Sequence, residues 1–331
     1  MIRFVVHADH QMTLRPYVTR WAGDIGRRIE IVSYDELFRS ARVPACTHVF
    51  SDLERLGDDD TEHAAAIWAA IRKAAPEVKL LNHPLLGMRR YELLRTLCEH
   101  GLNQFDAYRL TEARRPRRFP VFLRGENDHA GPLTRLLASQ RELDQAVEAL
   151  VKTGKNRGSI LIVEYCAEAS ERQLYRKYAA YSVEGEVIPR HLMVSREWVV
   201  KANSRVDEDA HREEERLYLD TNPHAEWIRR VFSLARIDYG RIDYGIVGGR
   251  PQAYEINTNP TIISAETEKP NPASEWFFGV FAERLARLEA ATPNGRAPRS
   301  VRLERPLKSL GARVAGTLLH RLIGRQLRRP I

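Results

Sequence analysis

The feature that most restricts how this chain can fold is a hairpin sequence at residues 241–260, RIDYGIVGGRPQAYEINTNP. Asp243 ends one expected strand, and a Gly-Gly turn leads into a second strand that carries Glu255 and Asn257. Because side chains alternate along a strand, Glu255 and Asn257 share a face, and a hairpin can bring Asp243 opposite them. Mg²⁺ prefers such carboxylate and amide oxygens as ligands. The alternative is a surface hairpin whose acids only face water.

The first 84 residues alternate short apolar runs with helical stretches. This alternation predicts a parallel α/β layer, in which helices connect the strands. The strands are expected at residues 2–7, 28–33, 47–50 and 78–82, and the clearest helix at residues 60–75. The polar residues near the strand ends, where such sheets bind ligands, are His7, Asp9, His10 and His83. They could contact a substrate or simply occupy loops.

The next region begins with an amphipathic helix at residues 88–100, followed by a strand at residues 119–124 and the loop sequence GENDHAG. Glycines let a backbone approach an anion closely, so this loop could cover phosphates, or it could be an ordinary turn. A patterned helix at residues 139–152 precedes the apolar strand SILIVEYC at residues 159–166. That strand ends in acidic residues and could form an adenosine slot, or it could be a core strand with a solvated exit.

The region after residue 173 predicts a second sheet. Strands are expected at residues 174–183, 187–195 and 198–201, with a hairpin turn between the first two. The cations and histidine expected to project from this sheet, where they could hold phosphates, are Lys177, Arg190, His191 and Lys201. The charged segment 206–222 is predicted as a surface loop or the start of a helix, and helices are expected at residues 223–235 and 274–288.

The order of these motifs resembles the ATP-grasp superfamily, particularly carboxylate–amine ligases such as glutathione synthetases, D-alanine–D-alanine ligases and the ribosomal-protein glutamate ligase. The resemblance covers roughly residues 80–262 and ends in the family's pattern of an aspartate, a turn and an ExNxxP strand. It implies an α/β (α+β) ATP-grasp fold with an N-terminal α/β pre-ATP-grasp domain and a basic amphipathic C-terminal helix. The implied domains are residues 1–84 (pre-ATP-grasp), 85–163 and 164–290 (the two ATP-grasp subdomains) and 291–331 (linker and tail).

The resemblance also implies roles for residues at matching positions. The implied metal ligands are Asp243, Glu255 and Asn257, with Glu255 bridging two Mg²⁺ ions that Mn²⁺ could replace. The implied ATP-binding residues are Arg90 (or its neighbour Arg89), Arg124, His129, Glu164, Tyr165, Cys166, Lys177, and either Glu168 or Glu171 as the ribose acid. The candidate catalytic residues, from their expected place beside the hairpin and the cationic sheet, are Arg190, Arg241 and Lys201.

Arg90 and Arg124 stand where the family has lysines, a departure that keeps the positive charge and offers bidentate phosphate binding. The implied activity is ATP-dependent ligation. A substrate carboxylate attacks the γ-phosphate to give an acyl phosphate, and an amine then displaces phosphate, the substrates being small molecules or peptides. Such chemistry needs mainly positioning and charge neutralisation. The alternatives are an ATP-grasp phosphotransferase that phosphorylates a small molecule, and a nucleotide-binding module without catalysis.

The net charge of +8 is concentrated in residues 296–331, which hold ten Lys/Arg and one acid. The preceding residues therefore total −1, which argues against a protein built to grip nucleic acid. Residues 306–329 predict a basic amphipathic helix that could contact an acidic membrane surface, a partner, the body of the protein or a second subunit in a homodimer. The three scattered cysteines, with no secretory signal and no apolar stretch of membrane length, predict a cytoplasmic protein.

Overall fold

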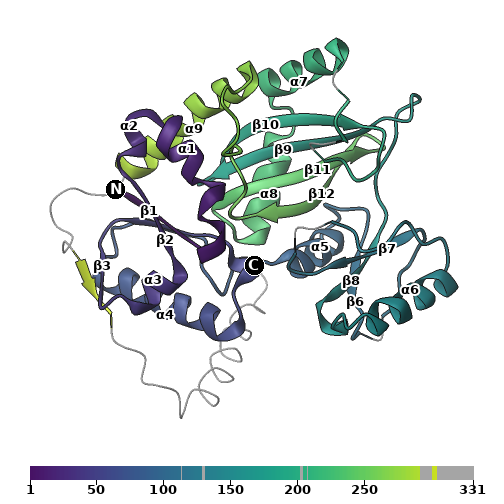
Figure 1. The fold of residues 1–331 in the computed structure, drawn as a ribbon, viewed down its shortest axis with the longest axis horizontal. Helices are drawn as coiled ribbons and strands as arrows, with labels where there is room; N and C mark the ends of the chain where they lie inside the picture. Colours follow the sequence, from purple (N-terminus) through teal and green to yellow (C-terminus); the bar gives the residue numbers. More distant parts are fainter. Residues whose placement is uncertain (113, 129–130, 202–203, 207, 291–299, 304–331) are drawn as a thin grey trace.

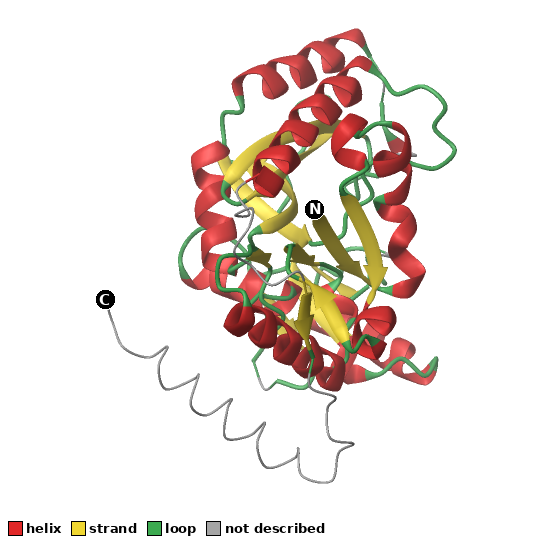
Figure 2. Cartoon of the chain, turned by 90° about the vertical axis from the view of Figure 1, so that its left-hand side faces the viewer, coloured by secondary structure: helices red, strands yellow, loops and turns green. Residues whose placement is uncertain are grey.

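The computed structural model describes residues 1–112, 114–128, 131–201, 204–206, 208–290 and 300–303. These residues form two four-stranded sheets, one three-stranded sheet and one two-stranded pair. The sheets occupy the interior of the molecule and most helices lie around its outside (Figure 1, Figure 2). The expected mixed α/β class is confirmed.

The N-terminal sheet is entirely parallel, as the alternation of strands and helices predicts, and has the order β2-β1-β4-β5. Its strands are β1 (Ile2–Val6), β2 (Ile29–Ser33), β4 (Thr47–Phe50) and β5 (Leu80–Leu81). Helix α4 (Asp58–Ala74) buries its apolar stripe, including Ile67 and Ile71, in the same cluster as Val5 and Phe50. The shorter elements here are η1 (Ala8–Thr13), α1 (Arg15–Arg20), α2 (Gly23–Gly26), α3 (Tyr34–Arg39), β3 (Arg42–Pro44) and η2 (Leu53–Arg55).

The second sheet is antiparallel, with the order β10-β9-β11-β12. Its strands are β9 (Tyr175–Val183), β10 (Glu186–Ser195), β11 (Tyr239–Val247) and β12 (Arg250–Asn257). Alternation along β9 sends Ala180 to the core beneath one face and Tyr181 to the core beneath the other. The first core includes residues of α7 (Asp209–Thr221) and α8 (Ala225–Ala235), and the second includes residues of α9 (Pro272–Ala290).

The third sheet has the order β6-β8-β7 and is antiparallel. Its strands are β6 (Ala107–Arg109), β7 (Val121–Gly125) and β8 (Ile160–Glu164), with α5 (Arg90–Glu99), α6 (Gln140–Lys152) and η3 (Arg157–Ser159) around them. Ser139 begins α6 by accepting a hydrogen bond from the backbone N–H of Glu142, which is a typical N-cap. The strand β6 was not predicted, because its three residues are too short to show a period.

The parallel sheet and the antiparallel sheet are joined by Asn82, a buried residue with a φ of 60°. Its Nδ2 donates to the carbonyl oxygens of Phe50 and Tyr239, at 3.0 and 2.8 Å, and its Oδ1 accepts from the backbone N–H groups of Asp238 and Tyr239. One side chain therefore satisfies four backbone groups from strands that are far apart in the sequence.

One expectation about the elements is wrong. Residues 198–201 form no strand, because the chain turns back there: Lys201 N–H donates to Ser204 Oγ, which lies 3.0 Å from Ser195 Oγ. The charged segment 206–222, expected as a surface loop or the start of a helix, is mostly the helix α7, whose Tyr218 and Leu219 are buried. The last residue of the expected linker, Ser300, begins an unpredicted strand, β13 (Ser300–Arg302), which pairs with β3. The basic helix predicted at residues 306–329 lies outside the described residues.

The part of the chain that the structure describes contains no helix long and apolar enough to cross a membrane. All three cysteines, Cys46, Cys98 and Cys166, are free thiols. The predicted absence of a disulfide framework therefore agrees with the structure.

Candidate functional site

A cavity of about 520 Å³ lies where the three-stranded sheet meets the antiparallel sheet. Its volume is in the range of small-molecule and cofactor sites. It brings together eleven residues that the sequence indicated as candidates: Arg124, Glu164, Tyr165, Cys166, Lys177, His191, Lys201, Arg241, Asp243, Glu255 and Asn257.

One part of the cavity wall is aromatic. The ring of Trp198 lies 5.0 Å from the ring of Phe122 and 5.7 Å from that of Tyr165, measured between centroids, and Tyr254 donates to the backbone oxygen of Cys166. Flat apolar rings suit a planar base. Phe122, Trp198 and Tyr254 were not predicted as site residues. The position of Trp198 close to Lys201 in the sequence could have indicated it.

Glu164 lines the cavity, but its carboxylate is committed to structural contacts. It is 3% exposed and accepts from Tyr108 Oη at 2.9 Å and from the backbone N–H groups of Arg117 and Asp106. It also lies 3.4 Å from Arg118 Nε. The side chain thus ties the basic loop at residues 114–118 to the sheet.

The two candidate ribose acids do not line the cavity. Glu168 accepts a hydrogen bond from the backbone N–H of Gly248 at 2.6 Å, and so supports the β11–β12 turn. Glu171 is exposed in the turn before β9. The geometry therefore gives no preference to either residue as a nucleotide contact.

Asp243 lies at the polar part of the cavity, where it is 4% exposed and held by two cations. Lys177 Nζ lies 3.1 Å from one carboxylate oxygen, and Arg241 Nε donates to the other at 2.8 Å. Burial alone would raise the pKa of the Asp243 carboxyl, but the charges of Arg241 and Lys177 outweigh burial and hold the pKa well below its usual range. Asp243 is therefore ionised at neutral pH.

Glu255 stands directly opposite Asp243 in the β11–β12 register and is also held by two cations. Arg90 Nη2 lies 2.5 Å from Glu255 Oε2, and Arg124 Nη2 lies 3.4 Å from the same oxygen. Burial and the charge of Arg90 lower the pKa of the Arg124 guanidinium to about 10, against the opposing effect of Glu255. The two arginines at the family's lysine positions thus meet at one carboxylate.

Arg90 also holds the glycine-containing loop, since its Nη1 donates to the carbonyl oxygens of Gly125, Glu126 and Asp128. The neighbouring Arg89 instead contacts Thr61 Oγ1 at 2.8 Å. The structure therefore places Arg90, and not Arg89, beside the candidate metal ligands.

The proposed metal ligands can be tested against this geometry. Asp243, Glu255 and Asn257 offer only oxygen donors from two adjacent strands, which suits Mg²⁺. The described residues contain no group of three or more His, Cys, Asp or Glu side chains that could hold a metal ion. The set fits Mg²⁺ if phosphate oxygens and water supply the remaining ligands, as is common for this ion.

Lys201 lines the cavity next to Gly131, the last residue of the loop predicted to cover phosphates. A Cβ added to Gly131 would lie 3.3 Å from Lys201 Nζ, and the φ of 101° at Gly131 is itself unfavourable for other residues. His191 lines the same wall, and burial together with the charges of Arg190 and Arg241 lowers its pKa well below the usual value. A neutral His191 adds no charge to the site.

Arg190, like Arg90, Glu168 and Glu171, is not among the lining residues. Its Nη2 contacts Ile262 O and Ser274 Oγ, and its guanidinium lies 4.8 Å from the ring centroid of Phe277. Its place between β10 and α9 is structural. His129 lies outside the described residues.

Solved structures share this fold. A D-alanine–D-alanine ligase from Bacillus anthracis matches with a TM-score of 0.52 and 14% identity, over 88% of this chain and 96% of that chain. The ATP-grasp ligase PsnB complexed with a minimal precursor matches with a TM-score of 0.51 and 11% identity, over 87% of this chain and 98% of that chain. No protein-family model and no curated protein matches the sequence.

At these identities the likeness is one of fold. It extends over most of both chains, so it includes the N-terminal layer as well as the two sheets that form the cavity. The fold predicted from the order of the sequence motifs is therefore confirmed.

Proposed function

We propose that this chain, which has the ATP-grasp fold, is an ATP- and Mg²⁺-dependent ligase that joins a carboxylate to an amine. The carboxylate would be activated as an acyl phosphate, and ADP and phosphate would be released. The carboxylate and the amine would belong to small molecules or peptides. The ligase PsnB, whose structure contains a precursor, is one fold relative with a peptide-like ligand.

The observation that carries this proposal is the composition of the single cavity described above. Its aromatic part fits a base, and its polar part combines Asp243 and Glu255 with Arg124 and Lys177. Two carboxylates for metal and several cations for phosphate are what phosphoryl transfer requires. A module that only binds nucleotide would have less need of both the carboxylates and the cations. An enzyme is therefore favoured over a binding module.

The roles of the residues follow from their contacts. Asp243, Glu255 and Asn257 would hold Mg²⁺, which supplies positive charge and orientation to the phosphates when bound. Arg124 and Lys177 now neutralise these carboxylates and would turn to phosphate oxygens once the carboxylates have a metal partner. Two Mg²⁺ ions would bind, with Glu255 between them, and Mn²⁺ would be able to replace Mg²⁺.

Arg241 and Lys201 would stabilise the negative charge that develops at the reacting centre, since both line the same cavity as Asp243. Positively charged groups fixed in a partly enclosed site stabilise charge that develops in the transition state. Arg190 is not proposed for this role, because its guanidinium contacts Ser274 and the ring of Phe277.

The test measures ADP release with a panel of amino acids, dipeptides and other carboxylates, in the presence of Mg·ATP and hydroxylamine. We expect ADP release together with a hydroxamate, since hydroxylamine traps an acyl phosphate. Release of ADP with a stable phosphorylated product and no hydroxamate would instead indicate the phosphotransferase. ATP binding without turnover for any carboxylate would leave only the binding module.

The variant Glu255→Gln should lower turnover by about 100-fold or more, because the group that holds metal charge is removed. The matched control is Glu226→Gln, since Glu226 is exposed on α8 and does not line the cavity. Full activity of Glu255→Gln would contradict the assignment of the metal ligands.

A further inference from the structure

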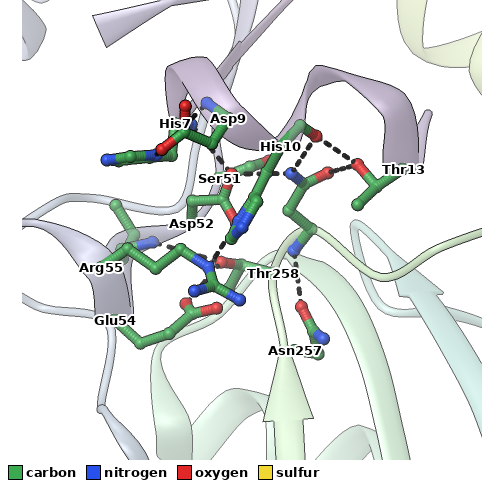
Figure 3. A network of polar contacts seen from close by, with 12 residues as sticks. His7, Asp9, His10, Thr13, Ser51, Asp52, Glu54, Arg55, Asn257 and Thr258 are labelled. Atoms are coloured by element: carbon green, nitrogen blue, oxygen red, sulfur yellow. Dashed lines mark hydrogen bonds and ion pairs between the residues drawn. The ribbon is translucent and has the colours of Figure 1, made fainter. Parts of the chain in front are cut away.

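A second cavity, of about 500 Å³, lies at the carboxyl ends of β1 and β4 (Figure 3). Its wall consists of His7, Asp9, His10, Glu54, Arg55, Leu56, Gly57 and Asn127. Ligands bind α/β sheets at this edge, where the strands end. Asn127 belongs to the loop that Arg90 holds, so this loop borders both cavities.

His10, one of the wall residues, is paired with the buried Asp52, which does not itself line the cavity. His10 Nδ1 lies 3.6 Å from Asp52 Oδ1, and Asp52 is 2% exposed with a left-handed φ of 54°. The other Asp52 oxygen accepts from His7 N–H at 2.8 Å and from Asn259 Nδ2 at 2.7 Å. Burial raises the pKa of Asp52, and these two hydrogen bonds act against that effect. With Nδ1 turned toward Asp52, Nε2 is the His10 nitrogen available to a ligand in the cavity.

Asn259 links this pair to the first cavity. Its Nδ2 also donates to His10 O, and its backbone N–H donates at 2.9 Å to Oδ1 of Asn257, a candidate metal ligand that lines the first cavity. Next to it, Thr258 Oγ1 donates to Glu54 Oε2 at 3.2 Å. Residues at the end of β12 therefore connect the part of the first cavity proposed to hold phosphate with the second cavity.

The second cavity is more acidic than the first. Two carboxylates, Asp9 and Glu54, line it against one arginine, Arg55. The buried Asp52 adds a third carboxylate nearby, 3.5 Å from Arg55. Helix α4 adds Asp58, Asp59 and Asp60 directly after Gly57 at the rim. Such a wall favours a cationic ligand over an anionic one. The anionic substrates of the proposed reaction suit the first cavity, which leaves the amine for the second.

We propose that the amine substrate binds in this second cavity, and that His10, positioned by Asp52, accepts the proton that the amine loses. This inference rests on the proposed ligase function. The ligand class is a primary amine without a carboxylate of its own, because a carboxylate would face the acidic wall.

The step balances as follows. The bound ammonium first gives one proton to His10 Nε2, and the nitrogen lone pair that this frees forms the C–N bond with the acyl carbon. The bond from that carbon to the phosphate oxygen breaks, the bonding electrons leave with phosphate, and the phosphate takes the second N–H proton. A positioned base of this kind contributes about 100-fold to 10,000-fold to a rate.

The experiment compares two nucleophiles in the full chain with Mg·ATP and a carboxylate that gives hydroxamate. The amines are ethanolamine, putrescine and glycine, and the second nucleophile is hydroxylamine, which is mostly uncharged at neutral pH and needs no base. We expect amide formation with ethanolamine or putrescine in preference to glycine. His10→Gln should lower kcat for amide formation by about 100-fold and change hydroxamate formation by less than about threefold.

Asp52→Asn is the positioning variant, because asparagine tolerates a left-handed φ. It should lower amide formation selectively as well, while His100→Gln, at the exposed end of α5, should change neither reaction. Far-UV circular dichroism and ATP affinity check that each variant is folded.

Three outcomes would overturn the inference. Equal loss of the amide and hydroxamate reactions in His10→Gln would give His10 a merely structural role. Unchanged amide formation in His10→Gln, or hydroxamate formation without amide from any of the three amines, would remove the amine site and leave the proposed function intact. A chain that forms no hydroxamate with any carboxylate would overturn the proposed function, and this inference with it.

Discussion

The side chains that line the first cavity include an aromatic group around Trp198 and two carboxylates held in ion pairs. Asp243 and Glu255 are each held by two cations across distances of 2.5 to 3.4 Å. These four cations come from four different strands or helices, so the charge balance depends on correct assembly of both sheets.

Trp198 should contribute to base binding, because its ring forms the aromatic wall with Phe122 and Tyr165. We expect Trp198→Ala to weaken ATP binding by about tenfold, the size of one lost aromatic contact with a base. Isothermal titration with ATP measures this change. Trp276→Ala is the control, since Trp276 is 42% exposed on α9; an equal loss in both variants would speak against a base in this position.

His48 should make stability depend on pH. Burial lowers its pKa from 6.5 to about 4, although the hydrogen bond with the Cys46 carbonyl acts the other way. Between these values the unfolded chain binds more protons, so the stabilising contribution is complete above pH 6.5 and is lost as the pH falls toward 4. The difference amounts to about 3 kcal/mol.

Urea unfolding of the wild type and His48→Gln between these pH limits measures the effect. We expect the variant to lose less stability than the wild type as the pH falls, by about 3 kcal/mol over the window. The exposed variant His100→Gln should follow the wild type. Parallel curves for the wild type and His48→Gln would contradict the buried neutral state of His48.

At the scale of elements, Asn82 joins the parallel sheet to the antiparallel sheet through four hydrogen bonds. Asn82→Asp keeps the shape and the left-handed φ, but removes both donors and places a carboxylate beside two carbonyl oxygens. We expect the free energy of unfolding to fall by about 3 kcal/mol, since each buried unsatisfied group costs 1–3 kcal/mol.

Asn222→Asp provides the comparison for Asn82→Asp in denaturant unfolding. Asn222 also has a left-handed φ, but its Nδ2 donates only to Val187 O at 3.1 Å among the described contacts. Its loss should be about 1 kcal/mol. If the two variants lost the same stability, Asn82 would not be the main connection between the sheets.

The same element scale explains the error at residues 198–201 and the conformation of α7. The strand expected at residues 198–201 has suitable residues, but Ser204 satisfies its backbone in a turn. The segment of α7 has many charges, yet Tyr218 and Leu219 give it a buried face against β10. In both cases a contact outside the segment decided its conformation.

For the whole molecule, the pairing of β13 with β3 attaches the beginning of the C-terminal segment to the N-terminal layer. Val301 and Leu303 are 3% and 9% exposed, and Leu303 N–H donates to Ala41 O at 3.0 Å. A chain ending at residue 303 should therefore be more stable than one ending at residue 299. Burial of these two side chains predicts a difference of about 3 kcal/mol.

Thermal unfolding of the two truncated chains, 1–303 and 1–299, measures that difference. A third chain, 1–303 with Arg302→Ala, controls for loss of an exposed strand residue, and it should unfold like 1–303. Equal melting temperatures for 1–303 and 1–299 would show that β13 adds nothing to the stability of the N-terminal layer.

The sequence by itself determined the local helices and strands and the order of the site motifs along the chain. Four parallel strands, the helices α4 and α6, and the β11–β12 hairpin follow from residue spacing, because each period is set by neighbours along the chain. The glycine turn fixes the register of the strand residues next to it, but a β-bulge between Asp243 and Tyr244 then shifts the pairing by one residue, and this shift places Asp243 opposite Glu255.

Only the tertiary structure decided which side chains meet across long separations. It placed Arg90, and not Arg89, on Glu255, 165 residues away, and it turned Arg190 toward Ser274. It engaged Glu164 and Glu168 in backbone hydrogen bonds and put His10 beside Asp52. Such contacts depend on the packing of whole sheets, and no local period in the sequence records how those sheets pack.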